Sequence, residues 1–254
     1  MRAVSIGTMA PTAPRGLGSV VSCLPGGDRL VPFVGELRLA VGVLRGREAW
    51  PGIQQPFNGQ ILRLRTVRAV IDAFEPDAFV ETGTFVGSTT RFFSGNGVPV
   101  YTTEVKRHFW LLARIRLGWS RDITVMRGDS RIALKRLAQH ESFARPLIYL
   151  DAHWWDDFPL NEELDLVFRS WADAVVVVDD FRVDGDDGYA FDTYDGVALA
   201  ISDITVPDGV MLAAPAQPSS EETGARRGAL YLAKGPRAEQ AVKALADRDL
   251  LRLL

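Results

Sequence analysis

The stretch Val80-Glu81-Thr82-Gly83-Thr84-Phe85-Val86-Gly87-Ser88-Thr89-Thr90 decides the fold, because it joins an apolar strand to the start of a helix. Residues 78–80 are predicted to form a buried parallel strand, and Ser88, Thr89 and Thr90 can cap a helix whose free N–H groups face the turn. Gly83 and Gly87 allow the backbone to approach a ligand closely. The sequence therefore predicts a strand-to-helix turn that holds a nucleotide-like cofactor.

The spacing of this turn, Glu-x-Gly-x-x-x-Gly, favours one class of cofactor. It lacks the third glycine of the dinucleotide fingerprint Gly-x-Gly-x-x-Gly, and it has an acid, Glu81, where that fingerprint has none. A carboxylate at this turn can accept hydrogen bonds from a cationic amino group. That suits the amino-acid end of S-adenosylmethionine (SAM) better than a pyrophosphate, so we expect SAM rather than a dinucleotide.

Two further predicted strands end in polar residues. Residues 98–104 form a strand that ends in Glu104, 21 residues beyond Gly83, which is about the distance at which an acid contacts ribose hydroxyls in nucleotide folds. Residues 123–126 form the next strand, and Asp129 and Ser130 follow it before an amphipathic run. Glu104 could instead be a solvated charge at a strand end, and Asp129 or Ser130 could simply cap the helix.

Three acids follow the fourth and fifth predicted strands. Residues 147–150 end at Asp151, and residues 174–178 end at Asp179 and Asp180. In open α/β sheets the ligand crevice lies beyond the carboxyl ends of the strands, so these carboxylates are expected to converge there. They could supply oxygen ligands to Mg²⁺, which typically takes one or two carboxylates and keeps several waters. Alternatively they are ordinary strand-end residues without a metal.

These motifs together resemble the class I SAM-dependent methyltransferases over residues 56 to 233. The acid after the fourth strand and the pair after the fifth resemble the metal site of the metal-dependent O-methyltransferases, notably the macrocin-type enzymes that methylate hydroxyls of sugar-bearing natural products. The resemblance implies an α/β, Rossmann-like, mostly parallel sheet of seven strands in the order 3-2-1-4-5-7-6, with the last strand antiparallel and helices on both faces.

The resemblance also implies roles for individual residues. It places Mg²⁺ at Asp151, Asp179 and Asp180, and it puts Asp129 against the adenine. Contacts to SAM are expected from the residues of the first turn and of the two strands after it: Glu81, Gly83, Thr84, Gly87, Ser88, Glu104, Asp129 and Ser130.

His153, two residues beyond Asp151, is the candidate general base, and Asp151 is the other catalytic candidate. Methyl transfer from a sulfonium to a hydroxyl requires alignment of donor and acceptor and the removal of one proton. An imidazole with an unperturbed pKa of about 6.5 can accept that proton near neutral pH. The alternative is an orienting or packed imidazole beside Trp154 and Trp155.

Other segments complete the predicted domain. Residues 61–74 have near-helical apolar spacing, and Asn58, Gln60 and Arg63 at the start of this helix could line the entrance to the site. The glycine-rich, acidic run 183–196 suits a lid, in which Tyr189 and Tyr194 would contact the acceptor. Residues 209–213 and 228–233 are predicted to form an antiparallel hairpin that closes the sheet.

Composition favours a globular enzyme. The chain has 254 residues, 47% of them hydrophobic, and a net charge of −3, which is enough for one α/β core and too near neutral to suggest nucleic-acid binding. The single Cys23 excludes a disulfide within one chain and fits a reducing compartment. No apolar run reaches the roughly 20 residues of a membrane helix, so a cytoplasmic protein is expected.

The chain divides into an N-terminal extension, residues 1–55, and a methyltransferase domain, residues 56–254. The extension is rich in Gly and Pro and could exchange with a neighbouring copy, which would give a homo-oligomer. The expected reaction is methyl transfer to a hydroxyl of a small-molecule acceptor, a sugar or natural product. Two other hypotheses stay open: an NAD-dependent oxidoreductase or epimerase, and a non-catalytic SAM-binding module. The acids at the acceptor side favour the enzyme.

Overall fold

The computed structural model describes residues 35, 38–46, 52–118, 120–152, 159–194 and 196–254. The predicted base His153 and the single Cys23 therefore lie outside the described residues, as does most of the predicted extension. Within the described part, residues 38–44 are helical, and the domain that follows begins with a short 3-10 turn, η1 (Pro56–Gly59).

One mixed sheet organises the described chain, with the strand order β10-β8-β9-β5-β4-β1-β2-β3. The five strands from β3 to β5 are parallel, β9 is antiparallel to β5, β8 is antiparallel to β9, and β10 is antiparallel to β8. The strands are β1 (Ala78–Thr82), β2 (Val100–Glu104), β3 (Ile123–Arg127), β4 (Pro146–Leu150), β5 (Ala174–Asp179), β8 (Met211–Pro215), β9 (Ala229–Lys234) and β10 (Leu251–Leu253).

The predicted architecture is confirmed with one correction. Counting β8 and β9 as the sixth and seventh strands gives the expected order 3-2-1-4-5-7-6, and the predicted tail hairpin matches β8 and β9 within two residues. The sheet has eight strands rather than seven, because β10 pairs with the outer edge of β8. A separate two-stranded sheet joins β6 (Thr193–Tyr194), at the end of the predicted lid, to β7 (Val197–Ala198), which directly follows it.

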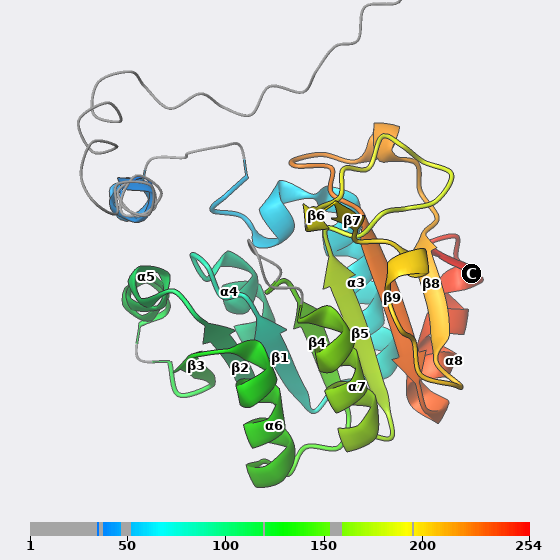
Figure 1. The fold of residues 1–254 in the computed structure, drawn as a ribbon, viewed down its shortest axis with the longest axis horizontal. Helices are drawn as coiled ribbons and strands as arrows, with labels where there is room; N and C mark the ends of the chain where they lie inside the picture. Colours follow the sequence, from blue (N-terminus) through cyan, green and yellow to red (C-terminus); the bar gives the residue numbers. More distant parts are fainter. Residues whose placement is uncertain (1–34, 36–37, 47–51, 119, 153–158, 195) are drawn as a thin grey trace, which may run out of the picture.

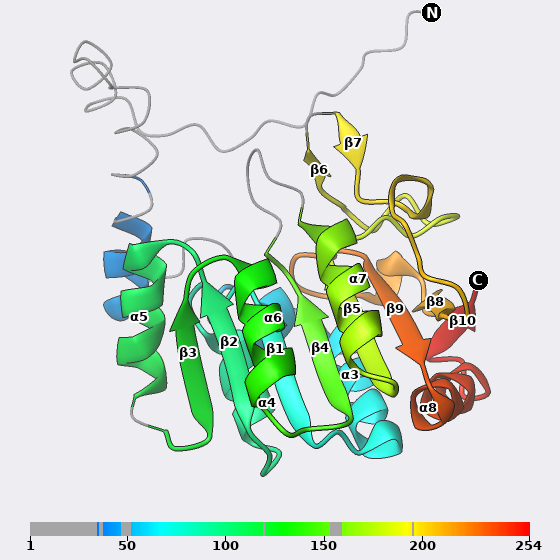
Figure 2. The same ribbon diagram turned by 60° about the horizontal axis from the view of Figure 1, so that its bottom comes forward.

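Helices cover both faces of the sheet (Figures 1 and 2). Helices α6 and α7 lie side by side on one face, and α3, α4 and α8 lie on the other. The helices are α3 (Ile61–Phe74), α4 (Ser88–Ser94), α5 (Arg107–Leu117), α6 (Ser130–His140), α7 (Leu160–Ser170) and α8 (Pro236–Ala246). No helix in the described ranges has the length and apolarity to cross a membrane.

The central strands are buried on both faces, which explains their unbroken apolar sequences. Every residue of β1, β4 and β5 is buried, as expected for parallel strands covered by helices. Alternate residues contribute to two cores, so Val175 and Val177 pack toward α3 and α8, whereas Val176 and Val178 pack toward α6 and α7. This double burial fixes the register, so the carboxyl ends of the strands lie together at one edge.

Candidate functional site

A cavity of about 280 Å³ opens at the carboxyl edge of the sheet. Its walls come from the turns that follow β1 to β5 and from the segment 53–58 before α3. The lining includes these sequence-predicted residues: Glu81, Gly83, Thr84, Ser88, Glu104, Asp129, Ser130, Asp151, Asp179 and Asp180. The structure thus brings most of the predicted site residues to one place, and Gly87 lies just beyond the lining.

Glu81 at the end of β1 is a buried acid with only 2% of its surface exposed. The Thr102 hydroxyl donates to Glu81 Oε2 at 2.7 Å, and the Thr90 hydroxyl donates to the same oxygen. Burial raises the pKa of Glu81 to about 7, although the two hydroxyl donors oppose the shift. Nearby Glu104 raises it further. Glu81 can therefore change charge near neutral pH.

The two glycines of the turn have structural roles that a residue with a Cβ could not fill as easily: one packs closely on β4 and the other begins a helix. Gly83 has a φ of 86°, and a Cβ on it would lie 2.2 Å from the backbone oxygen of Asp151. The turn after β1 therefore packs directly on the end of β4. Gly87 has a φ of 76° and is the N-cap of α4, with no side-chain hydrogen bond to the helix. The prediction that Ser88 to Thr90 cap this helix is wrong, since the Ser88 hydroxyl donates to the carbonyl of Ile53 instead.

Glu104 ends β2 beside the same turn. Its Oε2 accepts the backbone N–H of Phe85 at 2.9 Å, and its Oε1 accepts that of Lys106 at 2.8 Å. The acid is 7% exposed and borders the cavity, so it is more than the solvated strand-end charge considered as the alternative. A carboxylate accepts several hydrogen bonds, so these two contacts are compatible with a further bond from a ribose hydroxyl.

Asp129 caps α6, as its alternative interpretation predicts. Its carboxylate accepts the backbone N–H of Arg131 at 2.8 Å and forms an ion pair with the Arg131 guanidinium at 2.6 Å. These contacts hold the pKa of Asp129 below its usual value. Asp129 and Ser130 both line the cavity, so capping and a contact to the adenine are compatible.

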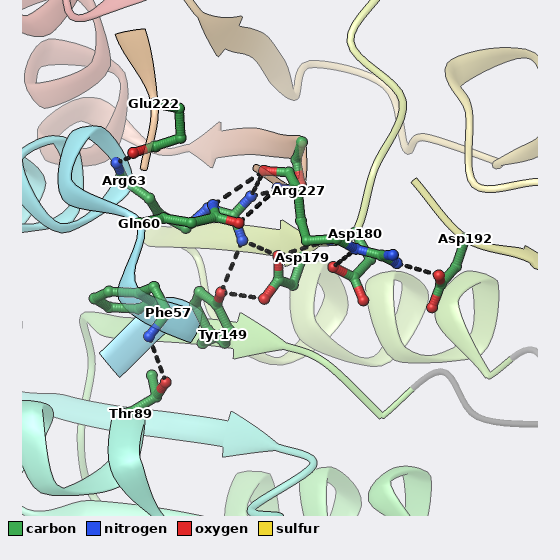
Figure 3. Close-up of polar contacts among 11 residues, drawn as sticks. Phe57, Gln60, Arg63, Thr89, Tyr149, Asp179, Asp180, Asp192, Glu222 and Arg227 are labelled. Atoms are coloured by element: carbon green, nitrogen blue, oxygen red, sulfur yellow. Dashed lines mark hydrogen bonds and ion pairs between the residues drawn. The ribbon is translucent and has the colours of Figure 1, made fainter. Parts of the chain in front are cut away.

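Asp179 at the end of β5 is fully engaged by protein donors (Figure 3). The buried guanidinium of Arg63, from the first turn of α3, forms an ion pair with Oδ1. The same oxygen accepts the backbone N–H of Asp180 at 2.7 Å, and Oδ2 accepts the hydroxyl of Tyr149 at 2.6 Å. Burial is the main effect that raises the pKa of Tyr149 well above its usual value, so this hydroxyl stays protonated and donates.

Asp180 is engaged by a second arginine. Arg227 Nε donates to Asp180 Oδ1 at 2.6 Å, and its Nη2 forms an ion pair with Asp192 in the predicted lid. Asp180 has a φ of 55°, an uncommon left-handed conformation for a residue that is not glycine. The second acid of the predicted pair therefore binds a guanidinium rather than standing free (Figure 3).

The described residues do not fit the predicted magnesium site. No group of three His, Cys, Asp or Glu side chains in the described ranges has an arrangement that could hold a metal ion. Arg63 and Arg227 neutralise Asp179 and Asp180, so two of the three predicted ligands already have cationic partners. The sequence prediction was incomplete because it did not pair these acids with arginines that lie far away in the chain.

Asp151 differs from the other two acids. Its backbone N–H donates to Thr82, and its partly exposed side chain borders the cavity. No hydrogen bond or ion pair to its carboxylate is seen in the described part of the chain. Burial raises the pKa of Asp151 well above its usual value, and the charges of Asp180 and Glu81 add to the effect. Asp151 is thus a carboxylate with a strong affinity for protons.

The two predicted acceptor-binding tyrosines lie away from the cavity lining. The Tyr189 hydroxyl donates to the carbonyl of Gln217 at 3.1 Å, and the Tyr194 hydroxyl donates to Asp192 at 3.2 Å. Both side chains are buried and neither borders the cavity. Their hydrogen bonds help to hold the segment before and within β6, and their contact with an acceptor stays a prediction.

The sequence predicts that Asn58 lines the entrance to the site, but it does not predict Phe57 or the strained turn that the two residues form before α3. Phe57 and Asn58 both border the cavity with positive φ angles of 53° and 54°. The backbone N–H of Phe57 donates to Thr89 Oγ1, which ties this turn to α4. Strain of this kind clusters at functional sites. The one sequence signal was the Asn-Gly pair at residues 58–59, which is typical of a tight turn.

The fold is also found in solved methyltransferases. The chain matches no protein-family model and no curated protein. A candidate O-methyltransferase from Klebsiella pneumoniae has a TM-score of 0.54 and 19% identity, covering 86% of this chain and 94% of its own. The O-methyltransferase TomG from Streptomyces achromogenes, involved in tomaymycin synthesis and solved with SAM, has a TM-score of 0.50 and 17% identity, covering 69% and 79%.

A candidate caffeoyl-CoA O-methyltransferase from Staphylococcus aureus has a TM-score of 0.50 and 13% identity, covering 68% of this chain and 83% of its own. At these identities the likeness concerns the fold. The chain has the fold of the class I SAM-dependent methyltransferases, as its sequence motifs predict.

Proposed function

We propose that this protein is a SAM-dependent methyltransferase that transfers a methyl group to a hydroxyl of a small molecule. The observation that carries the proposal is that Glu81, Glu104 and Asp151 border one cavity at the carboxyl edge of a methyltransferase-type sheet. Glu81 and Glu104 stand at the ends of adjacent strands, where a nucleoside ligand is expected. TomG, which shares the fold, was solved with SAM, and this likeness supports the choice of cofactor.

The donor would lie along the ends of β1, β2 and β3. In this arrangement the carboxylate of Glu81 accepts the ammonium of SAM, and the carboxylate of Glu104, which borders the cavity at the end of β2, accepts a ribose hydroxyl. Asp129 and Ser130 contact the adenine at the start of α6. Thr84 and Ser88 complete the wall, and Gly83 lets the turn pack closely on β4.

The acceptor would then meet the donor beside Asp151. The acceptor oxygen attacks the methyl carbon, the carbon–sulfur bond breaks, and S-adenosylhomocysteine leaves as a neutral thioether. The acceptor loses one proton, which Asp151 can take in its ionised form, because the residue borders the cavity and no other described residue forms a hydrogen bond or ion pair with its carboxylate. His153, two residues further along, stays a predicted base. The involvement of TomG in tomaymycin synthesis supports a natural-product acceptor.

Calorimetry with S-adenosylhomocysteine and with NAD tests this proposal. We expect the wild type and the control Glu221→Gln, which changes an exposed residue of the 3-10 turn η3 (Ser219–Glu221), to bind S-adenosylhomocysteine equally. Glu104→Gln should bind it at least about tenfold more weakly, because a hydrogen bond to a charged group is lost. Binding of NAD without S-adenosylhomocysteine would instead favour an oxidoreductase and would overturn the proposal.

A further inference from the structure

Two arginines pair with Asp179 and Asp180, the acids at the end of β5 that border the cavity. We propose that Arg63 and Arg227 take the place of a divalent cation beside Asp179 and Asp180, so that the methyl transfer proposed above proceeds without a metal ion. The inference about methyl transfer rests on the proposed function, whereas the contacts between the arginines and the acids do not depend on it.

Both carboxylate oxygens of Asp179 already accept from donors of the protein. One of its oxygens accepts from Arg63 and from the backbone of Asp180, and the other accepts from Tyr149. The side chain is about 2% exposed. A metal ion that bound this carboxylate would have to displace donors that are themselves buried, and each displaced donor would lose its partner.

Arg63 is held in position by further contacts of its side chain and its backbone. Its guanidinium also donates to the carbonyl of Gly228 at 2.7 Å and to that of Arg227. Its backbone N–H donates to Glu222 at 3.0 Å, and the N–H of Leu62 donates to the same carboxylate at 2.9 Å. Glu222 therefore anchors the start of α3 and holds Arg63 against Asp179. Arg63 cannot move away without breaking contacts at both ends.

Arg227 is the second arginine, and it pairs with the second acid, Asp180. Arg227 bridges Asp180 and Asp192. Burial lowers the pKa of its guanidinium, but the two carboxylates outweigh that effect and raise the pKa, so the group stays charged. Gln60 holds the backbone of Arg227 through both of its side-chain atoms, accepting from its N–H at 2.6 Å and donating to its carbonyl at 3.0 Å. The same helix start, residues 60–63, thus fixes both arginines (Figure 3).

The charges of these two arginines disfavour a divalent cation at this site. A divalent cation beside Asp179 and Asp180 would lie next to two guanidinium groups in a partly buried site, where repulsion between like charges is weakly screened. The arginines supply the positive charge that such a cation would bring. Asp151 is left as the carboxylate that faces the acceptor side of the cavity.

Titration with Mg²⁺ and Mn²⁺ tests this inference. The protein is loaded with S-adenosylhomocysteine and titrated calorimetrically, and the titration is repeated after treatment with EDTA. The variants are Arg227→Met, which frees Asp180 and Asp192, and the control Arg248→Met, which changes an exposed residue after α8. Wild type and control should show no metal binding below about 1 mM, whereas Arg227→Met should gain at least about tenfold in Mg²⁺ affinity.

Several results would overturn the inference. One is a wild-type dissociation constant for Mg²⁺ in the micromolar range, or binding of S-adenosylhomocysteine that depends on Mg²⁺. Another is a folded Arg227→Met protein that binds Mg²⁺ no better than the wild type. If that variant does not fold by circular dichroism, the wild-type titration decides alone. A protein that binds neither S-adenosylhomocysteine nor metal would contradict the proposed function and leave the exclusion of the cation standing.

Discussion

At the scale of single residues, we expect Glu81 to couple binding of the proposed donor to pH. Its pKa of about 7 comes mainly from burial, with Glu104 adding to it and Thr90 and Thr102 opposing it. The charged form attracts the ammonium of the donor, so affinity should be full above that pKa and fall as the pH drops through it. Between pH 8 and pH 6 the wild type should lose about tenfold in affinity for S-adenosylhomocysteine.

Glu81→Gln is the matching variant, because its amide cannot titrate. Its affinity at pH 8 should already be low and should change little down to pH 6. Calorimetry at pH 8, 7 and 6 measures how the affinity for S-adenosylhomocysteine changes with pH in the wild type and in the variant. Since Asp151 also lies near Glu81 and has a raised pKa, equal slopes in the two proteins would assign the pH dependence to Asp151 and contradict this prediction.

Glu163 in the first turn of α7 makes a second prediction at this scale. It is fully buried, and among the described residues neither carboxylate oxygen has a hydrogen-bond partner of good geometry. Burial raises the pKa of Glu163 to about 7, and the neighbouring hydroxyls of Ser130 and Thr82 offset only part of this. The folded state thus binds a proton that the unfolded state has released. Its contribution to stability is complete below about pH 4.5 and is lost as the pH rises through about 7.

Glu163→Gln should therefore stabilise the protein at pH 8 by up to about 3 kcal/mol and change little at pH 5. Thermal unfolding of both proteins at the two pH values measures the difference. The neighbouring Glu162→Gln is the control, because Glu162 is exposed and its contact to Arg131 is a surface ion pair. A variant less stable than the wild type at pH 8 would show that the carboxylate is partnered after all.

At the scale of elements, the turn after β1 depends on its contact with the end of β4. Gly83 and Gly97 both have positive φ angles, 86° and 75°, but only a Cβ on Gly83 would meet another backbone. Gly97→Ala should therefore cost about 1 kcal/mol, for the left-handed conformation alone. Gly83→Ala should cost at least about 2 kcal/mol more, because β1 and β4 must move apart. Urea unfolding of the two variants measures this difference, and equal losses would refute the packing role.

The same turn shows which elements the sequence makes predictable. The strands before Glu81 and Asp151 are recognisable because burial on both faces makes them continuously apolar, and the turns follow directly from them. The partners of Asp179 and Asp180 are not recognisable in this way. Arg63 lies 116 residues before Asp179, and only the folded sheet brings α3 to that edge. Local sequence patterns indicate which acids reach the site, but they do not indicate which arginines form ion pairs with them.

At the scale of the whole molecule, the eighth strand escaped prediction for a similar reason. β10 has three residues, too few for a periodic pattern, and it forms only because the edge of β8 offers free backbone groups. The parallel half of the sheet carries the cavity, whereas the antiparallel half, β9, β8 and β10, lies beyond β5. The cavity and the antiparallel half therefore lie in separate parts of the sheet, and we expect the antiparallel half to contribute stability rather than binding.

The separation can be tested at the end of the chain. Leu251 is 2% exposed and joins the core between α8 and the sheet, whereas Leu253 in the same strand is 44% exposed. Leu251→Ala should destabilise the protein by about 2 to 3 kcal/mol, and Leu253→Ala by less than about 0.5 kcal/mol. Both folded variants should bind S-adenosylhomocysteine as the wild type does. A loss of affinity in folded Leu251→Ala would mean that the antiparallel edge is coupled to the cavity, because no lining residue comes from that edge in the described chain.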